Sequence, residues 1–382
     1  MSERPRVLIS GPFFPIKQAL LSPLDICAQR LINQHLSKPR LERASDVVRL
    51  FGAVQAQEYA AAKWGIAQRT REATDAAVEK EMTDGAILRT HILRPTWHFV
   101  APQDIRWMQA LTAPRVRAML ASYDRKLELD KEVLRRSRSV LTKALRDGKQ
   151  LTRSELRDQL TKGRIRADGT QRLAHLMMHA ELDGLICSGG RRGKHFTYSL
   201  LEERVPPAKD LQRDEALSEL ILRFFTTRGP ATIHDFAWWS GLAKADATRG
   251  LQATANKLQS TIIGERTYWH PPATRVAKGK PALARLLPSY DEYFIGLKDR
   301  TAMLSKLGAA GGTSASILPF RHVVAIDGHI VAGWDWRPKG NSVAVEVKAF
   351  APLAKGDRLG IAGEVDRFSE FLRVPVSLEF ML

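Results

Sequence analysis

Cysteine is scarce in this chain of 382 residues, which contains only Cys27 and Cys187. Two cysteines cannot build a disulfide framework or a structural zinc site made mainly of thiolates, so the composition suits a reducing cytoplasm. No apolar run approaches the roughly 20 residues that cross a bilayer, and no membrane association is expected. The stretch from Pro5 to Leu21 is broken by glycine, prolines and lysine, and it does not predict a signal peptide.

Several familiar catalytic motifs are also missing. The chain has no His-Glu-x-x-His and no Gly-x-Ser-x-Gly, and its Gly-Lys pairs lack the upstream glycine of a phosphate-binding loop. Nucleotide hydrolysis and serine-hydrolase chemistry therefore have no support. His175 and His179 are four residues apart on a predicted helix, but the spacing indicates no third ligand, so we predict no metal site.

Acidic residues are in deficit. The chain has 59 Lys and Arg against 41 Asp and Glu, a formal charge of +18, whereas 44% apolar and 26% charged residues are ordinary for a globular protein. A surplus of this size attracts polyanions. Half of it lies between Arg115 and Arg172, with 17 basic and 8 acidic residues. A solvated helix surface is the plain alternative for any one arginine, but the cluster as a whole favours nucleic acid.

The first two thirds of the chain is mostly helical in pattern. The segment from Ser45 to Ala67 is rich in alanine and leucine, and it predicts a helix that begins at Ser45 as N-cap and is interrupted by Gly52. Further on, Arg94-Pro95 predicts the start of an extended run, because the residue before proline disfavours helix. A short strand is expected after it.

A weak internal repeat occupies the middle of the chain. Residues 148–156 and 229–236 each contain a glycine and then a threonine, Thr152 or Thr232, that can cap a helix. Each follows an apolar helix and precedes a second helix and a β-prone run. This order is typical of a winged helix-turn-helix. Residues 189–198 contain Arg191, Arg192 and Lys194 and predict a basic wing between two strands.

The last quarter of the chain changes to a period of two. Residues 323–332 predict a hairpin with an Asp327-Gly328 turn, and a third strand is expected over 342–350. A helix over 356–372 and a strand over 374–380 complete the prediction. We therefore expect an α+β protein with about three tandem winged helix-turn-helix units and a C-terminal β-hairpin or meander region. The predicted domains are residues 1–110, 111–207, 208–280 and 281–382.

Five short motifs, taken in order, are similar to one known family. From about residue 28 onward the chain resembles the winged-helix DNA glycosylases of the AlkZ/YcaQ type. The resemblance implies three winged-helix units curved around DNA and a Gln-x-Gln or Gln-x-Asp pair at the active site. The matching features are Val54-Gln55-Ala56-Gln57, residues 93–98, the helix starts near Thr152 and Thr232, residues 287–293, and the Asp327-Gly328 turn.

By this resemblance Gln55 and Gln57 are the catalytic residues. Gln57 stands where some relatives have a carboxylate, which places the chain with a subgroup that includes enzymes that unhook interstrand crosslinks. A purine alkylated at N7 is already cationic and can leave without a general acid, so two neutral amides can suffice if they hold water against an oxocarbenium-like sugar. The two amides lie about 200° apart on a helix. We therefore expect a turn, which Gly52 permits.

The function implied is a monofunctional DNA glycosylase that acts on N7-alkylated purines or interstrand crosslinks in duplex DNA. We expect a monomer without metal or organic cofactor, in the cytoplasm with the nucleoid. A non-catalytic DNA-binding regulator with tandem winged helices is the alternative, and it would need a dimer and a spaced site. A third possibility is a basic protein that binds an acidic partner, and its affinity for duplex DNA would then fall less steeply with salt.

Other residues are candidates for contact with DNA or the lesion. Arg94 can bind phosphate. His98 can contact DNA or the lesion, or be a core residue. Asp291 can orient water, a glutamine or a basic side chain, or simply cap a helix or turn. Trp238 and Trp239 are expected in the core. The basic candidates for the DNA backbone are Arg153, Arg191, Arg192 and Lys194.

Overall fold

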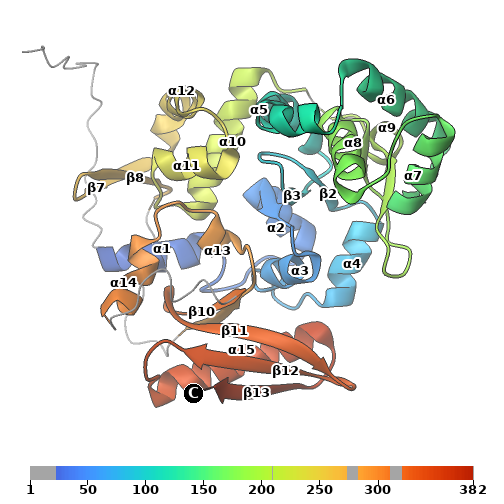
Figure 1. The fold of residues 1–382 in the computed structure, drawn as a ribbon. Coiled ribbons are helices and arrows are strands. Elements are labelled where there is room, and N and C mark those ends of the chain that lie inside the picture. The colour runs from blue at the N-terminus through green and yellow to red at the C-terminus, as the bar shows by residue number, and fades with distance from the viewer. Residues whose placement is uncertain (1–22, 209, 273–282, 310–320, 382) are drawn as a thin grey trace, which may run out of the picture.

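The computed structural model describes residues 23–208, 210–272, 283–309 and 321–381 (Figure 1). The predicted absence of a signal peptide over Pro5 to Leu21 concerns residues outside these ranges. Within them, no helix is both long and apolar enough to cross a bilayer. One order of elements occurs three times along the chain: a helix, a short extended segment, two helices and two strands.

The first unit contains the Gln55 segment. Its strands form a sheet in the order β1-β3-β2. The predicted helix from Ser45 to Ala67 is wrong in its middle, because Gly52 at φ 76° ends one helix and leads into a strand. The N-cap is Arg43 rather than Ser45. The elements are α1 (Pro23–Asn33), α2 (Ala44–Phe51), β1 (Ala53–Gln55), α3 (Tyr59–Ala67), α4 (Asp75–Thr83), β2 (Leu88–His91) and β3 (Trp97–Val100).

A long helix, α5 (Ile105–Lys126), leads to the second unit. The strands of this unit form a sheet in the order β4-β6-β5, and the predicted basic wing lies between the two strands that pair. The elements are α6 (Lys131–Leu145), β4 (Leu151–Thr152), α7 (Arg153–Lys162), α8 (Thr170–Leu182), β5 (Ile186–Ser188), β6 (Thr197–Leu200) and α9 (Leu201–Arg204).

The third unit has the same order, with its first strand reduced to one bridge between Ala231 and Trp269. The predicted caps are confirmed here and in the second unit: Thr152 and Thr232 each accept the backbone N–H three residues on, and Glu155 and Asp235 return the contact. The elements are α10 (Arg213–Arg228), α11 (Ile233–Ser240), α12 (Lys244–Thr254), a 3-10 turn (Ala255–Lys257), β7 (Gln259–Ile263) and β8 (Arg266–His270).

The C-terminal region is a five-stranded sheet in the order β13-β12-β11-β10-β9. The hairpin at Asp327-Gly328 is confirmed, with Ile326 opposite His329. The last strand runs parallel to β12, and helix α15 connects the two. The elements are β9 (Ala284–Leu287), α13 (Glu292–Ile295), α14 (Thr301–Ala309), β10 (His322–Ile326), β11 (His329–Lys339), β12 (Ser342–Ala349), α15 (Lys355–Leu372) and β13 (Val376–Met381).

The first unit lies at the centre of the molecule. Figure 1 shows the second unit in green and the third in yellow on either side above it, with the C-terminal sheet in red below. Alternate residues of its sheet enter different cores: Ala53 and Val100 pack with the third unit, whereas Val54 and Phe99 pack with the C-terminal sheet. Both faces of this small sheet are therefore covered. Polar side chains gather where β1 ends and β3 begins.

Candidate active site

Gln55 is the last residue of β1 and is only 5% exposed. It lies directly opposite His98 of β3, and directly opposed residues of an antiparallel pair share a face. The backbone N–H of Gln55 donates to Glu292 Oε1 at 2.7 Å, and its side-chain Oε1 accepts from Arg94 Nη2 at 2.9 Å. No described residue bonds its amide nitrogen, so Gln55 is fixed through its oxygen and can still donate.

A buried ion pair supports Gln55 from behind. Glu292 of α13 is 1% exposed, and its Oε2 accepts from Arg228 at 2.6 and 2.8 Å and from Trp239 Nε1 at 3.1 Å. Burial lowers the pKa of the Arg228 guanidinium, and the charge of Glu292 opposes that shift. Sequence reasoning missed this pair because its members are 64 residues apart and lie in otherwise apolar segments.

Arg94 lies in the loop between β2 and β3 and connects Gln55 with Trp238. Its guanidinium carbon lies 5.6 Å from the centre of the Trp238 ring. Burial lowers its pKa, and Glu292 acts in the opposite direction. The prediction that Trp238 is a core residue is wrong, since it is 41% exposed, whereas Trp239 is in the core at 1%. A flat aromatic surface therefore lies at the edge of the site.

His98 is fully buried and neutral. Burial, reinforced by the nearby charge of Arg94, lowers its pKa well below the usual value. Its Nδ1 contacts the carbonyl oxygen of Thr96 at 2.9 Å, and a carbonyl only accepts, so Nδ1 carries the proton. That leaves Nε2 as an acceptor. Three buried atoms here, His98 Nε2, Arg94 Nε and Thr96 Oγ1, have no partner among the described residues, and such groups normally bind protein or water.

Gln57 follows two residues after Gln55 and is exposed. Its Oε1 accepts from the backbone N–H of Trp97 at 3.3 Å, which ties it to the start of β3. The expectation that both glutamines lie in a turn is wrong for Gln55, which belongs to a strand. Gln57 lies in a bend beyond the end of that strand.

Asp291 is buried, and both of its carboxylate oxygens accept hydrogen bonds. Its two oxygens accept from Arg69, each at 2.9 Å, and its Oδ1 also caps α13 through the N–H of Tyr293. Of the alternatives that the sequence left open, the structure shows the cap and the contact with a basic side chain. Contact between Asp291 and a lesion stays a prediction that this geometry does not favour.

The predicted basic residues gather in the second unit and at its wing. Arg191 lies 3.4 Å from Glu79, and Arg192 lies 2.8 Å from Glu155. Arg153 donates to the carbonyl oxygen of Thr170 at 3.1 Å. Lys194 is exposed, and no described residue pairs with it. Their contacts with DNA stay predictions.

No group of His, Cys, Asp and Glu within the described ranges has the arrangement of a metal site. His175 and His179 both contact Oδ1 of Asp124, at 3.3 and 2.9 Å. Cys27 and Cys187 are both free and buried.

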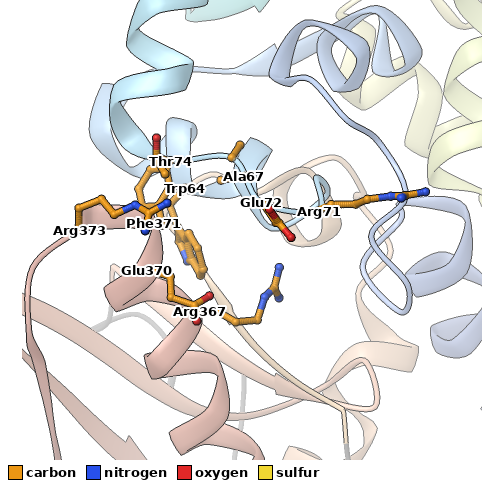
Figure 2. A pocket seen from close by; sticks show the side chains of 10 residues that line it. Trp64, Ala67, Arg71, Glu72, Thr74, Arg367, Glu370, Phe371 and Arg373 are labelled. Atoms are coloured by element: carbon orange, nitrogen blue, oxygen red, sulfur yellow. The ribbon is translucent and has the colours of Figure 1, made fainter.

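A hollow of about 290 Å³ lies away from Gln55, between the α3–α4 connection and α15 (Figure 2). Arg71 points away from the other labelled side chains there, and Arg367 is bonded to Glu364. Trp64 donates its Nε1–H to the carbonyl oxygen of Leu286. These contacts serve the packing of the first unit against α15.

The repeated units, the basic surplus and the polar site around Gln55 together define a DNA-acting enzyme. The chain belongs to the AlkZ-like DNA glycosylase family, which matches residues 48–371. It is therefore an enzyme of the class that hydrolyses N-glycosyl bonds. This membership tells against the alternative of a non-catalytic regulator.

Two comparisons with proteins of Streptomyces sahachiroi agree with the family. The chain is 26% identical over 383 residues to an interstrand DNA cross-link repair glycosylase. The matched region covers 93% of this chain and 98% of that protein. The solved structure of the DNA glycosylase AlkZ is similar in fold, with a TM-score of 0.75 at 21% identity, and it covers 94% of this chain and 100% of that one.

Proposed function

We propose that this protein is a monofunctional DNA glycosylase that hydrolyses the N-glycosidic bond of N7-alkylated purines, or of purines in interstrand crosslinks, in duplex DNA. It acts as a monomer without metal or organic cofactor, on DNA in the cytoplasm. The family, and the cross-link repair glycosylase to which the chain is similar, support this proposal.

The chemistry relies on neutral side chains, Gln55, Gln57 and His98. A base alkylated at N7 carries a positive charge, so its bond to the sugar breaks without a proton donor. The protein must then hold water beside C1′ as an oxocarbenium-like sugar forms. Gln55 accepts a hydrogen bond from Arg94 and can donate one to the water through its amide nitrogen. Gln57 lies two residues further on and is exposed. His98 Nε2 accepts a hydrogen bond from the water. Glu292 and Arg228 fix the backbone beneath Gln55 without adding much net charge.

DNA binding is assigned to the three repeated units, each of which we take as a winged helix over the predicted boundaries, with residues 281–382 as a separate C-terminal region. Arg94 and the basic residues of the second unit, Arg153, Arg191, Arg192 and Lys194, face the backbone. Trp238 offers its exposed ring to a base beside Gln55.

The observation that carries the proposal is the preorganised Gln55, whose side chain is held by Arg94 and whose backbone N–H is held by Glu292, beside buried polar atoms without partners among the described residues. The test is incubation with duplex DNA that contains 7-methylguanine or a nitrogen-mustard crosslink, followed by measurement of released base and abasic sites. We expect release by the parent and a loss of at least about a hundredfold in the Gln55→Ala/Gln57→Ala variant, comparable with removal of one oxyanion-hole donor.

The matched control is Gln252→Ala, an exposed glutamine on α12 outside the site, which should retain the parent rate. Absence of release by the parent protein refutes the activity. Release by the double variant at the rate of the control refutes the roles of Gln55 and Gln57.

A further inference from the structure

The sheet of the first unit has a second polar face, opposite to Gln55. In the strand register Arg89 lies opposite Phe99, and His91 lies opposite Trp97, one residue out of phase with the Gln55–His98 pair. Side chains of neighbouring strand residues point to opposite faces. Arg89 and Trp97 therefore lie on the other side of the sheet from Gln55, the side on which Phe99 packs with the C-terminal sheet and Trp97 packs with the second unit.

Arg89 is a buried cation without an acidic partner. It is 7% exposed, and its guanidinium carbon lies 4.2 Å from the ring centre of Trp97 and 4.8 Å from that of Phe196. Its Nε donates to the carbonyl oxygen of Ala56 at 3.1 Å, but no carboxylate among the residues that the structure describes forms an ion pair with it. Burial lowers its pKa to about 10. An anion at this position would stabilise the charge.

The neighbouring Glu181 does not supply that anion. It is fully buried, and its carboxylate is hydrogen-bonded to His91, whose ring lies 4.0 Å from that of Trp97. The ring of His91 therefore packs against Trp97. The contacts of the Arg89 guanidinium are therefore its aromatic neighbours and the carbonyl oxygen of Ala56. An anion that binds it would have to come from the solvent side.

Arg89 opens into a groove of about 470 Å³ between the first and second units. Further lining comes from the wing of the second unit and from the first turn of α7, where backbone N–H groups and the helix dipole favour negative charge. Glu155 also lies in that turn, but it is engaged by Thr152 and Arg192. The lining includes Arg89, Trp97, Arg153, Ser154, Lys194 and Phe196.

Cationic groups beside half-buried aromatic rings match one kind of ligand, a phosphate joined to a planar base. We propose that this groove binds one unpaired nucleotide of the substrate DNA, with its phosphate at Arg89 and Lys194 and its base against Trp97 and Phe196. The proposal rests on the proposed function, because it takes DNA as the substrate. The groove is a separate subsite from the excision site, since the sheet lies between Arg89 and Gln55.

The test compares the affinity of the full-length protein for two labelled duplexes of the same sequence, one fully paired and one with a single bulged nucleotide, by fluorescence anisotropy. Stacking of one base predicts about tenfold tighter binding of the bulged duplex. Phe196→Ala and Lys194→Gln should each reduce this preference at least threefold. The control is Tyr123→Ala, an aromatic residue on α5 that is 52% exposed and lies outside the groove, and it should keep the preference.

The Gln55→Ala/Gln57→Ala variant separates this inference from the proposed function. We expect it to lose base release and to keep the preference for the bulged duplex. Equal affinity of the parent for both duplexes overturns the nucleotide subsite, as does full retention of the preference in either groove variant. Loss of the preference in the glutamine variant overturns it as well, because the nucleotide would then lie at Gln55.

Discussion

Replacement of Glu292 by glutamine tests whether a buried ion pair holds the active site together. The carboxylate accepts hydrogen bonds from the N–H of Gln55, from two nitrogens of Arg228 and from Trp239 Nε1, at 2.6 to 3.1 Å. Glutamine has nearly the same volume, but its amide nitrogen cannot accept. The variant therefore leaves the fully buried Arg228 without a counter-charge and loses at least one acceptor.

The free energy of unfolding should fall by about 3 kcal/mol. Removal of one partner from a buried pair costs about 3 to 5 kcal/mol, because an uncompensated charge stays in the interior. The lower end applies here, since Arg228 keeps three acceptors in Phe51, Ala53 and Thr227 and its stacking on Trp239 at 4.2 Å. The folded variant should also release alkylated base more slowly, because the backbone of Gln55 loses its anchor.

Urea unfolding followed by circular dichroism measures the loss. The matched control is Glu346→Gln, which removes a similar contact with Arg337 at 2.7 Å from side chains that are 61% and 30% exposed. An exposed pair contributes at most about 1 kcal/mol. If Glu292→Gln is no less stable than Glu346→Gln, the idea that this pair supports the site is refuted.

Three further predictions follow from single contacts. Arg94→Ala removes the charged donor to Gln55 Oε1. A hydrogen bond to a charged group contributes about 1.5 to 3 kcal/mol, so single-turnover base release should slow at least about tenfold. An unchanged rate would contradict this prediction. Burial lowers the pKa of His322 to about 4, so below pH 6.5 the unfolded chain binds a proton that the folded chain does not. His322 should therefore contribute about 2 kcal/mol to the loss of stability between pH 6.5 and 5, and His322→Gln should reduce that loss by the same amount in urea titrations. Thr152→Ala should cost about 1 kcal/mol in the same assay through loss of the α7 cap, while Thr142→Ala, at a half-buried position in the last turn of α6 that caps no helix, should cost less.

The parts of the fold that sequence predicted are those with local signals. The hairpin at Asp327-Gly328 forms because both turn residues adopt positive φ, which these residue types tolerate. The helix starts at Thr152 and Thr232 form because the capping contacts span only three residues. In each case the deciding interaction lies within a short segment of chain.

The errors occurred where distant contacts decide. The Ala-rich composition between Ser45 and Ala67 favours helix, but residues 53–55 pair with β3 and become a strand. Pairing with a strand more than 40 residues away has no signature within that segment. Trp238 was expected in the core beside Trp239, yet neighbouring helical residues face directions about 100° apart, and only one of the two rings is buried.

The candidate site shows the same division. Gln55 and Gln57 were found through a short motif, whereas Glu292 and Arg228, which position Gln55, come from elements that meet only in the folded chain. Arg89 has no local signal, because it precedes the extended run predicted from Arg94-Pro95 and a lone arginine resembles any surface residue. Its significance lies in burial without an acidic partner, which is a property of the packing between two units.

The sheet of the first unit explains how a strongly basic protein can limit the positive charge beside Gln55 to the guanidinium of Arg94. Gln55 and the neutral His98 lie on one face, where the charge of Arg228 is matched by Glu292. Arg89 and Lys194 lie with the groove on the other face. A dense positive charge beside Gln55 would oppose both a cationic base and a cationic sugar. Apart from Arg94, placing the DNA-binding charge away from this face retains affinity for the backbone and spares the transition state most of that repulsion.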